Sequence, residues 1–410
     1  MSDLRRIVII GAGECGMRAA LTLRDEGYEG EIDLIHGEAV EPYERPPLSK
    51  PGMGELVLKP IMGSDRLVSE KINFHRDQTA IRIDRQSKRI ALSNSETIVY
   101  DCLLFATGAR ARELVLNGRH VEGVRVLRTF ADSQALYNDL KPGCRLTVIG
   151  GGFIGLELAA AARQRDAIVT VIEAAPRLLG RAVPPDIASR IEARHRTEGV
   201  IFHIGQSIVS IDQARVVALS DASTITSDVI VAGIGSVPHV ELAAATGLSI
   251  DNGIAVDACF RSSDVDIFAA GDCCSFPHPL YGMKRMRLES WRAAQEQGAH
   301  AARAILGATD PYNSVPWFWS DHYDLTLQIA GLPSEGTKTI VRSLDEASEI
   351  LFHLDQTGRL VGASGIGPGN RIARDIRLAE MVIAKHIHPD ENALADPAIS
   401  LKSILSSASR

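Results

Sequence analysis

The sequence predicts an α/β protein in which one domain is inserted into a similar one, followed by a C-terminal α+β domain. Two stretches, residues 6–24 and 145–163, each join a short apolar run to a glycine cluster and then to an apolar pattern of helical period. Residues 101–108 and 228–235 each resemble a strand that ends in a glycine turn, and a third such strand is expected at residues 266–272. Apolar runs of this kind are typical of parallel strands buried on both faces.

The order of these segments predicts the division into domains. A chain of 410 residues is too long for one hydrophobic core, because single cores stop growing at roughly 250–300 residues. We expect residues 113–242 to be inserted into a domain formed by residues 1–112 and 243–316. Alternating stretches such as 325–329 and 350–354, with a candidate helix at 374–384, predict an antiparallel sheet with helices over residues 317–410.

Composition excludes several classes of protein. The net charge of -7 argues against a nucleic-acid-binding protein. The six cysteines form no Cys-x-x-Cys pair, so a disulfide framework or a metal site is not expected. The sequence shows no secretory pattern and no run of about 18 apolar residues, so we expect a cytoplasmic protein without a membrane span.

The first glycine cluster, Gly11, Gly13 and Gly16, follows an apolar run and opens a helical pattern. In a G-x-G-x-x-G loop, glycines allow a tight turn, close approach of the backbone to a pyrophosphate, and close packing of helix on strand. An acid about 20 residues later binds the ribose hydroxyls. Glu38 lies slightly beyond that spacing, and it could instead be a solvated carboxylate in a turn. This region therefore predicts a Rossmann-like dinucleotide site.

The second cluster, Gly150, Gly152 and Gly155, has the same context, and Glu173 ends the next predicted strand. A carboxylate there accepts a hydrogen bond from the ribose 2′-hydroxyl and repels a 2′-phosphate, which favours NADH over NADPH. Arg177 and Arg181 lie just beyond Glu173 and could weaken this preference. We expect the backbone of Gly233 and Gly235 to approach the nicotinamide half. Two dinucleotide sites in one chain suggest a resident flavin, FAD, and an exchangeable NADH.

Several motifs together resemble one family. They are P-Y-E-R-P-P-L-S-K at residues 42–50, A-T-G at 106–108, V-L-R-T at 126–129, G-G-G-F-I-G-L-E at 150–157, G-D at 271–272, E-S-W at 289–291 and P-W-F-W-S-D at 316–321. Over nearly the whole chain, this combination resembles the NADH:ferredoxin reductase components of multicomponent oxygenases. That family includes the putidaredoxin reductase and biphenyl dioxygenase reductase types, within the glutathione-reductase-like flavoprotein superfamily.

The resemblance implies an NADH:ferredoxin oxidoreductase that passes electrons through FAD to a [2Fe–2S] ferredoxin. That ferredoxin would feed an oxygenase of Rieske or cytochrome P450 type. The resemblance places Lys50, Glu157 and Trp319 at the reacting part of the flavin, although Lys50 alone would suggest a surface lysine and Glu157 a helix N-terminal carboxylate. It also implies cofactor-binding roles for Arg45, Ala80, Ala106, Thr107, Gly108, Arg128, Ile154, Asp272, Glu289 and Trp291.

The expected partner is an acidic ferredoxin. A local excess of basic residues includes Lys284, Arg285 and Arg287, and we expect these side chains to steer the ferredoxin to its docking surface. We expect the chain itself to be a monomer or a homodimer. No cysteine lies between residues 16 and 102, which argues against a disulfide reductase or an NADH oxidase of this superfamily. The alternatives that stay open are an apoptosis-inducing-factor-like flavoprotein that senses NADH and a rubredoxin reductase. An NADH oxidase is a third alternative, which the missing cysteine disfavours.

Overall fold

The structure is a computed structural model that describes residues 4–50, 56–180 and 183–407. Its contacts divide the chain into two compact units, each formed by separate segments. The first unit comprises Met1–Glu44, Leu58–Arg110 and Val237–Ser314, and the second comprises Arg45–Val57, Ala111–Ser236 and Val315–Arg410. The boundaries of the three domains expected from the sequence stay a prediction beside this division into two units.

A five-stranded parallel sheet forms the centre of the first unit. Its order is β20 (Ile267–Ala269), β7 (Cys102–Phe105), β1 (Arg6–Ile10), β2 (Glu31–His36) and β3 (Ile72–Arg76). The apolar run of β1 explains its central place, because Ile7, Val8 and Ile9 are completely buried. Helix α1 (Glu14–Asp25) follows β1 and packs against α7 (Trp291–Ile305).

Smaller elements complete the first unit. An antiparallel sheet contains β4 (Ala80–Asp84), β5 (Arg89–Leu92) and β6 (Thr97–Val99), and a second small sheet contains β19 (Ile254–Ala255), β21 (Cys274–His278) and β22 (Lys284–Met286). The short helices are α2 (Ser64–Ser69), α6 (Glu241–Ala245) and the 3-10 turn η2 (Pro279–Tyr281). Strands β8 (Ala109–Ala111) and β18 (Ser236–Pro238) pair where the chain leaves and re-enters this unit.

The second unit contains a four-stranded parallel sheet. Its order is β13 (Ile201–Ile204), β12 (Ile168–Glu173), β11 (Arg145–Ile149) and β17 (Val229–Ala232). Its other elements, up to β17, are η1 (Pro46–Ser49), β9 (Val115–Leu116), β10 (Arg119–His120), α3 (Phe130–Asp139), α4 (Phe153–Arg163), α5 (Pro185–Thr197), β14 (Ile208–Ile211), β15 (Val216–Leu219) and β16 (Thr224–Thr226). In each parallel sheet a glycine loop therefore joins one strand, β1 or β11, to the helix that follows it, α1 or α4, as the sequence predicts.

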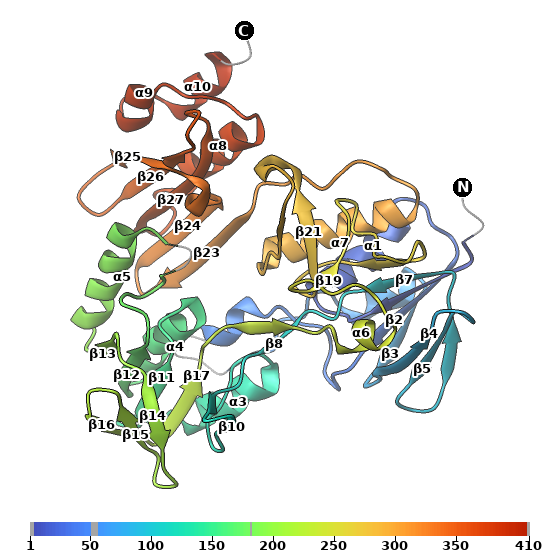
Figure 1. Ribbon diagram of the computed structural model, residues 1–410, viewed down its shortest axis with the longest axis horizontal. Helices are drawn as coiled ribbons and strands as arrows, with labels where there is room; N and C mark the ends of the chain where they lie inside the picture. Colours follow the sequence, from blue (N-terminus) through green and yellow to red (C-terminus); the bar gives the residue numbers. More distant parts are fainter. Residues whose placement is uncertain (1–3, 51–55, 181–182, 408–410) are drawn as a thin grey trace. The chain divides into compact units, whose positions relative to one another are not determined.

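The C-terminal part of the second unit is an antiparallel sheet with helices. The strand order is β23 (Trp317–His322), β24 (Leu325–Gly331), β27 (Leu360–Pro368), β26 (Glu349–Leu354) and β25 (Lys338–Ser343). The turn η3 (Pro333–Glu335) and helices α8 (Ala373–Ala384), α9 (Glu391–Ala395) and α10 (Leu401–Ser407) complete it, in orange and red in Figure 1. Helix α8 packs on β24 and β27. The predicted α/β class with a C-terminal α+β part is confirmed.

The internal repeat has a physical basis at the start of each parallel sheet. The Asp101 carboxylate accepts hydrogen bonds from the backbone N–H groups of Arg5 and Arg6, both at 2.8 Å. The Asp228 carboxylate accepts from the Arg145 backbone N–H at 2.8 Å and also binds the Arg145 guanidinium. This guanidinium lowers the pKa of Asp228 to about 2. The aspartate before each closing strand thus anchors the first strand of its sheet.

A shared core joins the inserted segment to the C-terminal sheet within the second unit. Leu156 of α4 and Ile187 and Ile191 of α5 belong to the same buried cluster as Leu327 and Ile329 of β24. Burial of such aliphatic side chains is the main favourable contribution to folding, at about 25 cal/mol per Å² of apolar surface. The two segments therefore stabilise one another.

Two buried histidines lie at the contact between α5 and β23. Nε2 of His195 is 3.2 Å from Nδ1 of His322, and both side chains are fully buried. Burial, and then the charge of Arg194, lowers the pKa of His195 to about 4. Burial, followed by the charges of His195 and Lys50, lowers the pKa of His322 well below its usual value. Both imidazoles are therefore neutral at neutral pH.

These histidines predict that acid destabilises the protein. At His195, the unfolded chain binds a proton below about pH 6.5, whereas the folded chain binds it only below about pH 4, so the free energy of unfolding falls as pH falls through this window. The lowered pKa of His322 acts in the same direction. Each such histidine contributes about 1.4 kcal/mol per pH unit. Denaturant unfolding of His195→Gln between pH 7.5 and 5 should show a correspondingly shallower slope than the unsubstituted protein. The matched control is His120→Gln, because His120 is exposed. If the free energy of unfolding depends equally on pH in the unsubstituted protein, His195→Gln and His120→Gln, the account is contradicted.

Candidate functional site

The first glycine loop is closed by contacts that exclude a side chain at two of its three glycines. Gly11 has a φ of +108°, and a Cβ there would lie 2.2 Å from the Ala106 carbonyl oxygen. A Cβ at Gly16 would lie 1.8 Å from the Gly11 carbonyl oxygen. By contrast, a Cβ at Gly13, the N-cap of α1, would meet no atom within 4 Å. The loop is therefore tight against its own strands and open at the helix N-terminus, which fits an anionic diphosphate.

Glu38 follows strand β2 and is held by a neighbour. Its Oε2 accepts a hydrogen bond from the Tyr43 hydroxyl at 2.7 Å. The preceding turn is fixed by buried His36, whose Nε2 lies 2.8 Å from the Val40 carbonyl oxygen and whose ring stacks on Phe74. Ala80 is buried at the start of β4. The roles of Glu38 and Ala80 at a dinucleotide stay predictions.

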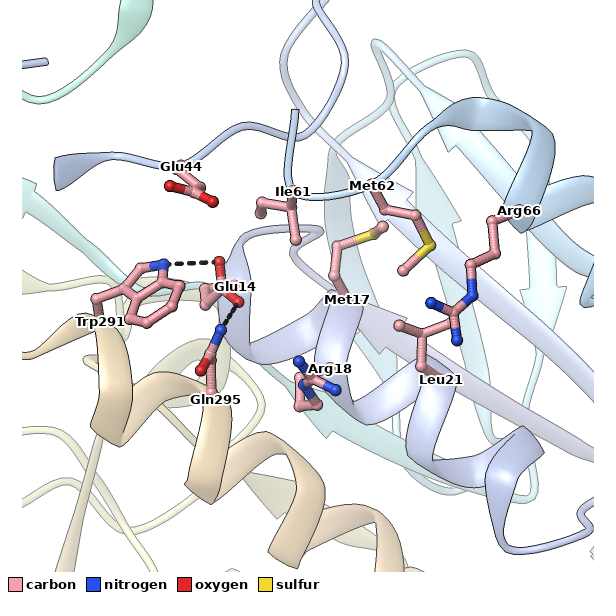
Figure 2. A pocket seen from close by; sticks show the side chains of 10 residues that line it. All are labelled: Glu14, Met17, Arg18, Leu21, Glu44, Ile61, Met62, Arg66, Trp291 and Gln295. Atoms are coloured by element: carbon pink, nitrogen blue, oxygen red, sulfur yellow. Dashed lines mark hydrogen bonds between the residues drawn. The ribbon is translucent and has the colours of Figure 1, made fainter. Parts of the chain in front are cut away.

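Glu14, which the sequence analysis did not single out, lies in the first turn of α1 and binds helix α7. Figure 2 shows its carboxylate accepting hydrogen bonds from Trp291 Nε1 at 3.0 Å and Gln295 Nε2 at 2.6 Å. Burial raises the pKa of Glu14. These contacts give Trp291 a structural role, because they hold α7 to α1, the helix that follows the first glycine loop. Glu289, the other predicted cofactor-binding residue of this segment, pairs with Arg287. The sequence signal that could have pointed to Glu14 is an acidic residue within the first glycine motif.

A hollow of about 140 Å³ lies beside these contacts (Figure 2). Its walls combine acidic, basic and apolar side chains. They are Glu14, Met17, Arg18, Leu21, Glu44, Ile61, Met62, Arg66, Trp291 and Gln295.

The closing strand β7 and strand β20 bring further predicted residues to the first loop. Thr107, between Ala106 and Gly108, donates a hydrogen bond from its hydroxyl to the His239 carbonyl oxygen at 2.8 Å. Asp272 follows β20 after Gly271, whose N–H donates to Gln297 Oε1 at 2.8 Å. The A-T-G and G-D motifs thus end neighbouring strands of one sheet, at the carboxyl ends where ligands bind in folds of this kind.

The second glycine loop repeats the first. Gly150 has a φ of +104°, and a Cβ there would lie 2.5 Å from the Gly233 carbonyl oxygen. A Cβ at Gly155 would lie 2.2 Å from the Gly150 carbonyl oxygen, whereas one at Gly152 would come no closer than 3.9 Å to Gly233. The predicted Gly235 follows in the same turn after β17. This loop is also open only at the N-terminus of its helix.

The acid of the second site is held against its glycine loop. Glu173 accepts hydrogen bonds from the backbone N–H groups of Gly151 at 2.8 Å and Ala175 at 2.7 Å. Arg177 donates to the carbonyl oxygens of Gly180 and Val183, both at 2.9 Å, so its guanidinium is held within its own loop. Arg181 lies outside the described residues.

Ile154 is an exposed aliphatic side chain in the first turn of α4. It is 46% exposed, whereas the neighbouring Leu156 is completely buried. The sequence places Ile154 among the cofactor-binding residues, and its exposure leaves an apolar surface at the second glycine loop for a ligand. That role stays a prediction.

Lys50 lies in a charged cluster of the second unit. Its Nζ is 3.3 Å from Oε1 of Glu157 and 2.9 Å from Oδ2 of Asp321. It also lies 5.3 Å from the centre of the Trp319 ring, within range of a cation–π interaction. The structure thus brings together Lys50, Glu157 and Trp319, the three predicted catalytic residues, and adds Asp321.

Segments distant in sequence position this cluster. Two hydroxyl groups of α3 fix the turn η1, which lies just before Lys50. The Ser133 hydroxyl donates to the Leu48 carbonyl oxygen at 2.9 Å, and the Tyr137 hydroxyl donates to the Ser49 carbonyl oxygen at 3.2 Å. Trp319 stacks on Trp317, with ring centres 5.5 Å apart. Arg45 donates to the backbone carbonyl of Arg128 at 2.5 Å, so two predicted FAD-binding residues are in contact.

The basic residues of the proposed docking surface differ in their local contacts. Arg285 donates from its guanidinium to the carbonyl oxygens of Val256 at 3.1 Å and Ser275 at 2.6 Å, and Arg287 pairs with Glu289. Lys284 is exposed on β22. Arg285 therefore has a structural role that charge counting along the sequence did not reveal.

No group of three or more metal-binding side chains occurs among the described residues. In the same residues, no helix combines the length and apolar character that crossing a membrane requires.

Comparison with known proteins identifies two families in this chain. Residues 5–298 match the pyridine nucleotide-disulphide oxidoreductase family, and residues 317–405 match the reductase C-terminal family. The chain is 39% identical to the anthranilate 1,2-dioxygenase system ferredoxin–NAD(+) reductase component of Burkholderia cepacia, over 97% of this chain and 98% of that one. It is 38% identical to rhodocoxin reductase of Rhodococcus erythropolis, over 97% of this chain and 93% of that one.

A solved structure also resembles this one throughout. In the crystal structure of the covalent putidaredoxin reductase–putidaredoxin complex, the matching chain has a TM-score of 0.92 and 31% sequence identity. The match covers 99% of both chains.

Glu173 predicts a preference between nicotinamide cofactors. Replacing it with alanine removes a carboxylate that would bind the ribose hydroxyls and repel a 2′-phosphate. Loss of a hydrogen bond to a charged group corresponds to roughly 1.5–3 kcal/mol, so the KM for NADH should rise about tenfold or more while that for NADPH stays level or falls.

Initial rates with both cofactors measure this effect. Glu192→Ala is the matched control, because Glu192 pairs with Arg196 on α5 and does not contact the glycine loop. An unchanged ratio of kcat/KM values in Glu173→Ala would exclude Glu173 as the residue that selects NADH.

Proposed function

We propose that this chain, which belongs to the pyridine nucleotide-disulphide oxidoreductase family and carries a reductase C-terminal domain, passes electrons from NADH through FAD to a [2Fe–2S] ferredoxin. The observation that carries the proposal is the pair of glycine loops. Among the three glycines of each motif, only the middle one, Gly13 or Gly152, has room for a ligand, and each loop is followed by its own acid, Glu38 or Glu173. Bound FAD would accept a hydride from the nicotinamide and release electrons singly. The ferredoxin would supply an oxygenase.

The residues would divide into two sets. The first loop, with Gly11, Gly13, Gly16 and Glu38, holds FAD, and the second, with Gly150, Gly152, Gly155 and Glu173, holds NADH. Lys50 and Glu157 present a paired charge to the reacting part of the flavin, and Trp319 covers it. Because the lysine ammonium is already bound by carboxylates, it is oriented before any ligand arrives.

The cysteines support exit of electrons directly from the flavin. Each of the six is a free thiol. Those nearest the first glycine loop, Cys15, Cys273 and Cys274, are buried, and burial raises the pKa of all three. A disulfide relay requires an accessible thiolate. A small one-electron acceptor suits this chain better than a disulfide substrate does.

The finer points of the assembly belong to the same proposal. We expect an acidic ferredoxin to dock near Lys284, Arg285 and Arg287. We also expect this chain to be a monomer or homodimer and to be located in the cytoplasm. Lys284 is the most suitable of the three for steering, since Arg285 also holds backbone carbonyls. Electrostatic complementarity of this kind acts mainly on the association rate.

Stopped-flow kinetics tests the function. NADH should reduce the flavin of the purified holoenzyme rapidly, and a [2Fe–2S] ferredoxin should reoxidise it more than about tenfold faster than rubredoxin or dioxygen does. Preference for rubredoxin would identify a rubredoxin reductase. Slow reduction accompanied by NADH-dependent dimerisation would contradict the proposal in favour of an NADH sensor.

Charge reversal tests the docking surface. Lys284→Glu should slow ferredoxin reduction about tenfold at low ionic strength and much less at high ionic strength, while flavin reduction by NADH is unchanged. The control is Lys71→Glu, an exposed lysine that precedes the edge strand β3. Equal rates for both variants at every salt concentration would remove Lys284 from the docking surface.

A further inference from the structure

The ammonium group of Lys50 is shared between two carboxylates. Glu157 lies 3.3 Å from Nζ and Asp321 lies closer, at 2.9 Å. A lysine ammonium has three N–H donors, so it can bind both carboxylates at once. One carboxylate is enough to neutralise the lysine. With both Glu157 and Asp321, the three groups together carry a formal charge of one negative unit.

Glu157 is fixed independently of Lys50. Its Oε1 accepts a hydrogen bond from the Ser320 hydroxyl and its Oε2 accepts one from the Ser49 hydroxyl, both at 2.6 Å. Hydroxyl-to-carboxylate bonds this short are charge-assisted and strong. The glutamate side chain is only 8% exposed. Glu157 therefore cannot follow a movement of the lysine.

Asp321 connects Lys50 to Trp319. Its Oδ2 accepts hydrogen bonds from Lys50 Nζ and from Trp319 Nε1, the latter at 3.2 Å. Its Oδ1 accepts from the hydroxyl of Thr326, its partner on β24, at 3.1 Å. Residues 319 and 321 alternate with Ser320 along β23, so both lie on one face of the sheet. Although Asp321 is 41% exposed, three donors orient its carboxylate.

We propose that Asp321 is a positioning residue that holds the Lys50 ammonium against the Trp319 ring and sets the net charge beside the flavin. This inference rests on the proposed function, which places the reacting part of FAD at the Lys50 cluster. The carboxylate of Asp321 opposes the accumulation of negative charge that accompanies flavin reduction, and the ammonium of Lys50 favours it. The balance between these two charges determines how readily NADH reduces the enzyme and how readily the enzyme reduces its partner.

The midpoint potential of the bound flavin tests this proposal. In Asp321→Asn the cluster becomes neutral while the amide oxygen still accepts hydrogen bonds, so the potential should shift to more positive values. In Lys50→Gln the cluster gains a negative unit, so the potential should shift in the opposite direction. Equilibrium titration of the FAD-loaded proteins against a reference dye measures both shifts.

Two further variants separate charge from structure. Asp321→Glu retains the carboxylate and should keep a potential close to that of the unsubstituted protein. Asp324→Asn removes a carboxylate that pairs with Arg194 near the end of the same hairpin, and it should leave the potential unchanged. A shift of equal size in Asp321→Asn and Asp324→Asn would show a general effect of protein charge and would overturn the role of Asp321.

The outcomes also distinguish this inference from the proposed function. If Lys50→Gln shifts the potential and Asp321→Asn does not, Asp321 has no such role and the flavin still lies at the cluster. If neither variant shifts the potential, the flavin does not lie there, and both the inference and the placement of FAD are wrong.

Discussion

The close approach of glycine to backbone carbonyl oxygens is the constraint on which both sites depend. At Gly16 and Gly155, a side chain would collide with the carbonyl oxygen of the first glycine of the same loop, at 1.8 and 2.2 Å. At Gly11 and Gly150, a side chain would collide with the turn that follows the closing strand. These contacts bring strand, helix and closing strand together at one edge of each sheet. They leave the middle glycine, at the helix N-terminus, open to a ligand.

The charged cluster depends on a different kind of arrangement. Ser49 and Lys50, Glu157, and Ser320 with Asp321 come from three distant parts of the sequence, and they meet only because η1, α4 and β23 pack within the second unit. The apolar core shared by α4, α5 and the C-terminal sheet supports that packing. The glycine loops would therefore determine where dinucleotides bind, and the cluster would determine the charge that a bound flavin experiences.

Local patterns explain what could be predicted from the sequence. The two loops, the strands after them and the C-terminal antiparallel sheet were predicted because each rests on short-range spacing, such as the glycines at 150, 152 and 155. The Lys50–Glu157 pair was expected only by resemblance, since nothing near Lys50 indicates a partner at position 157. Asp321, Ser49 and Ser320 were missed because their contacts exist only in the folded chain. Arg285 was interpreted by its charge, whereas its hydrogen bonds go to backbone carbonyls.

The central claim is that the two loops hold different dinucleotides, and alanine at their middle glycines tests it most directly. Gly13 and Gly152 have φ values of -70° and -85°, and a Cβ at either would meet no protein atom closer than 3.9 Å, so both variants should fold. The account predicts that Gly13→Ala loses FAD more readily during purification. Gly152→Ala should retain FAD, which dithionite reduces normally, but should need a higher NADH concentration to reduce it. Loss of FAD from Gly152→Ala, or weakened NADH binding with full FAD retention in Gly13→Ala, would contradict the account.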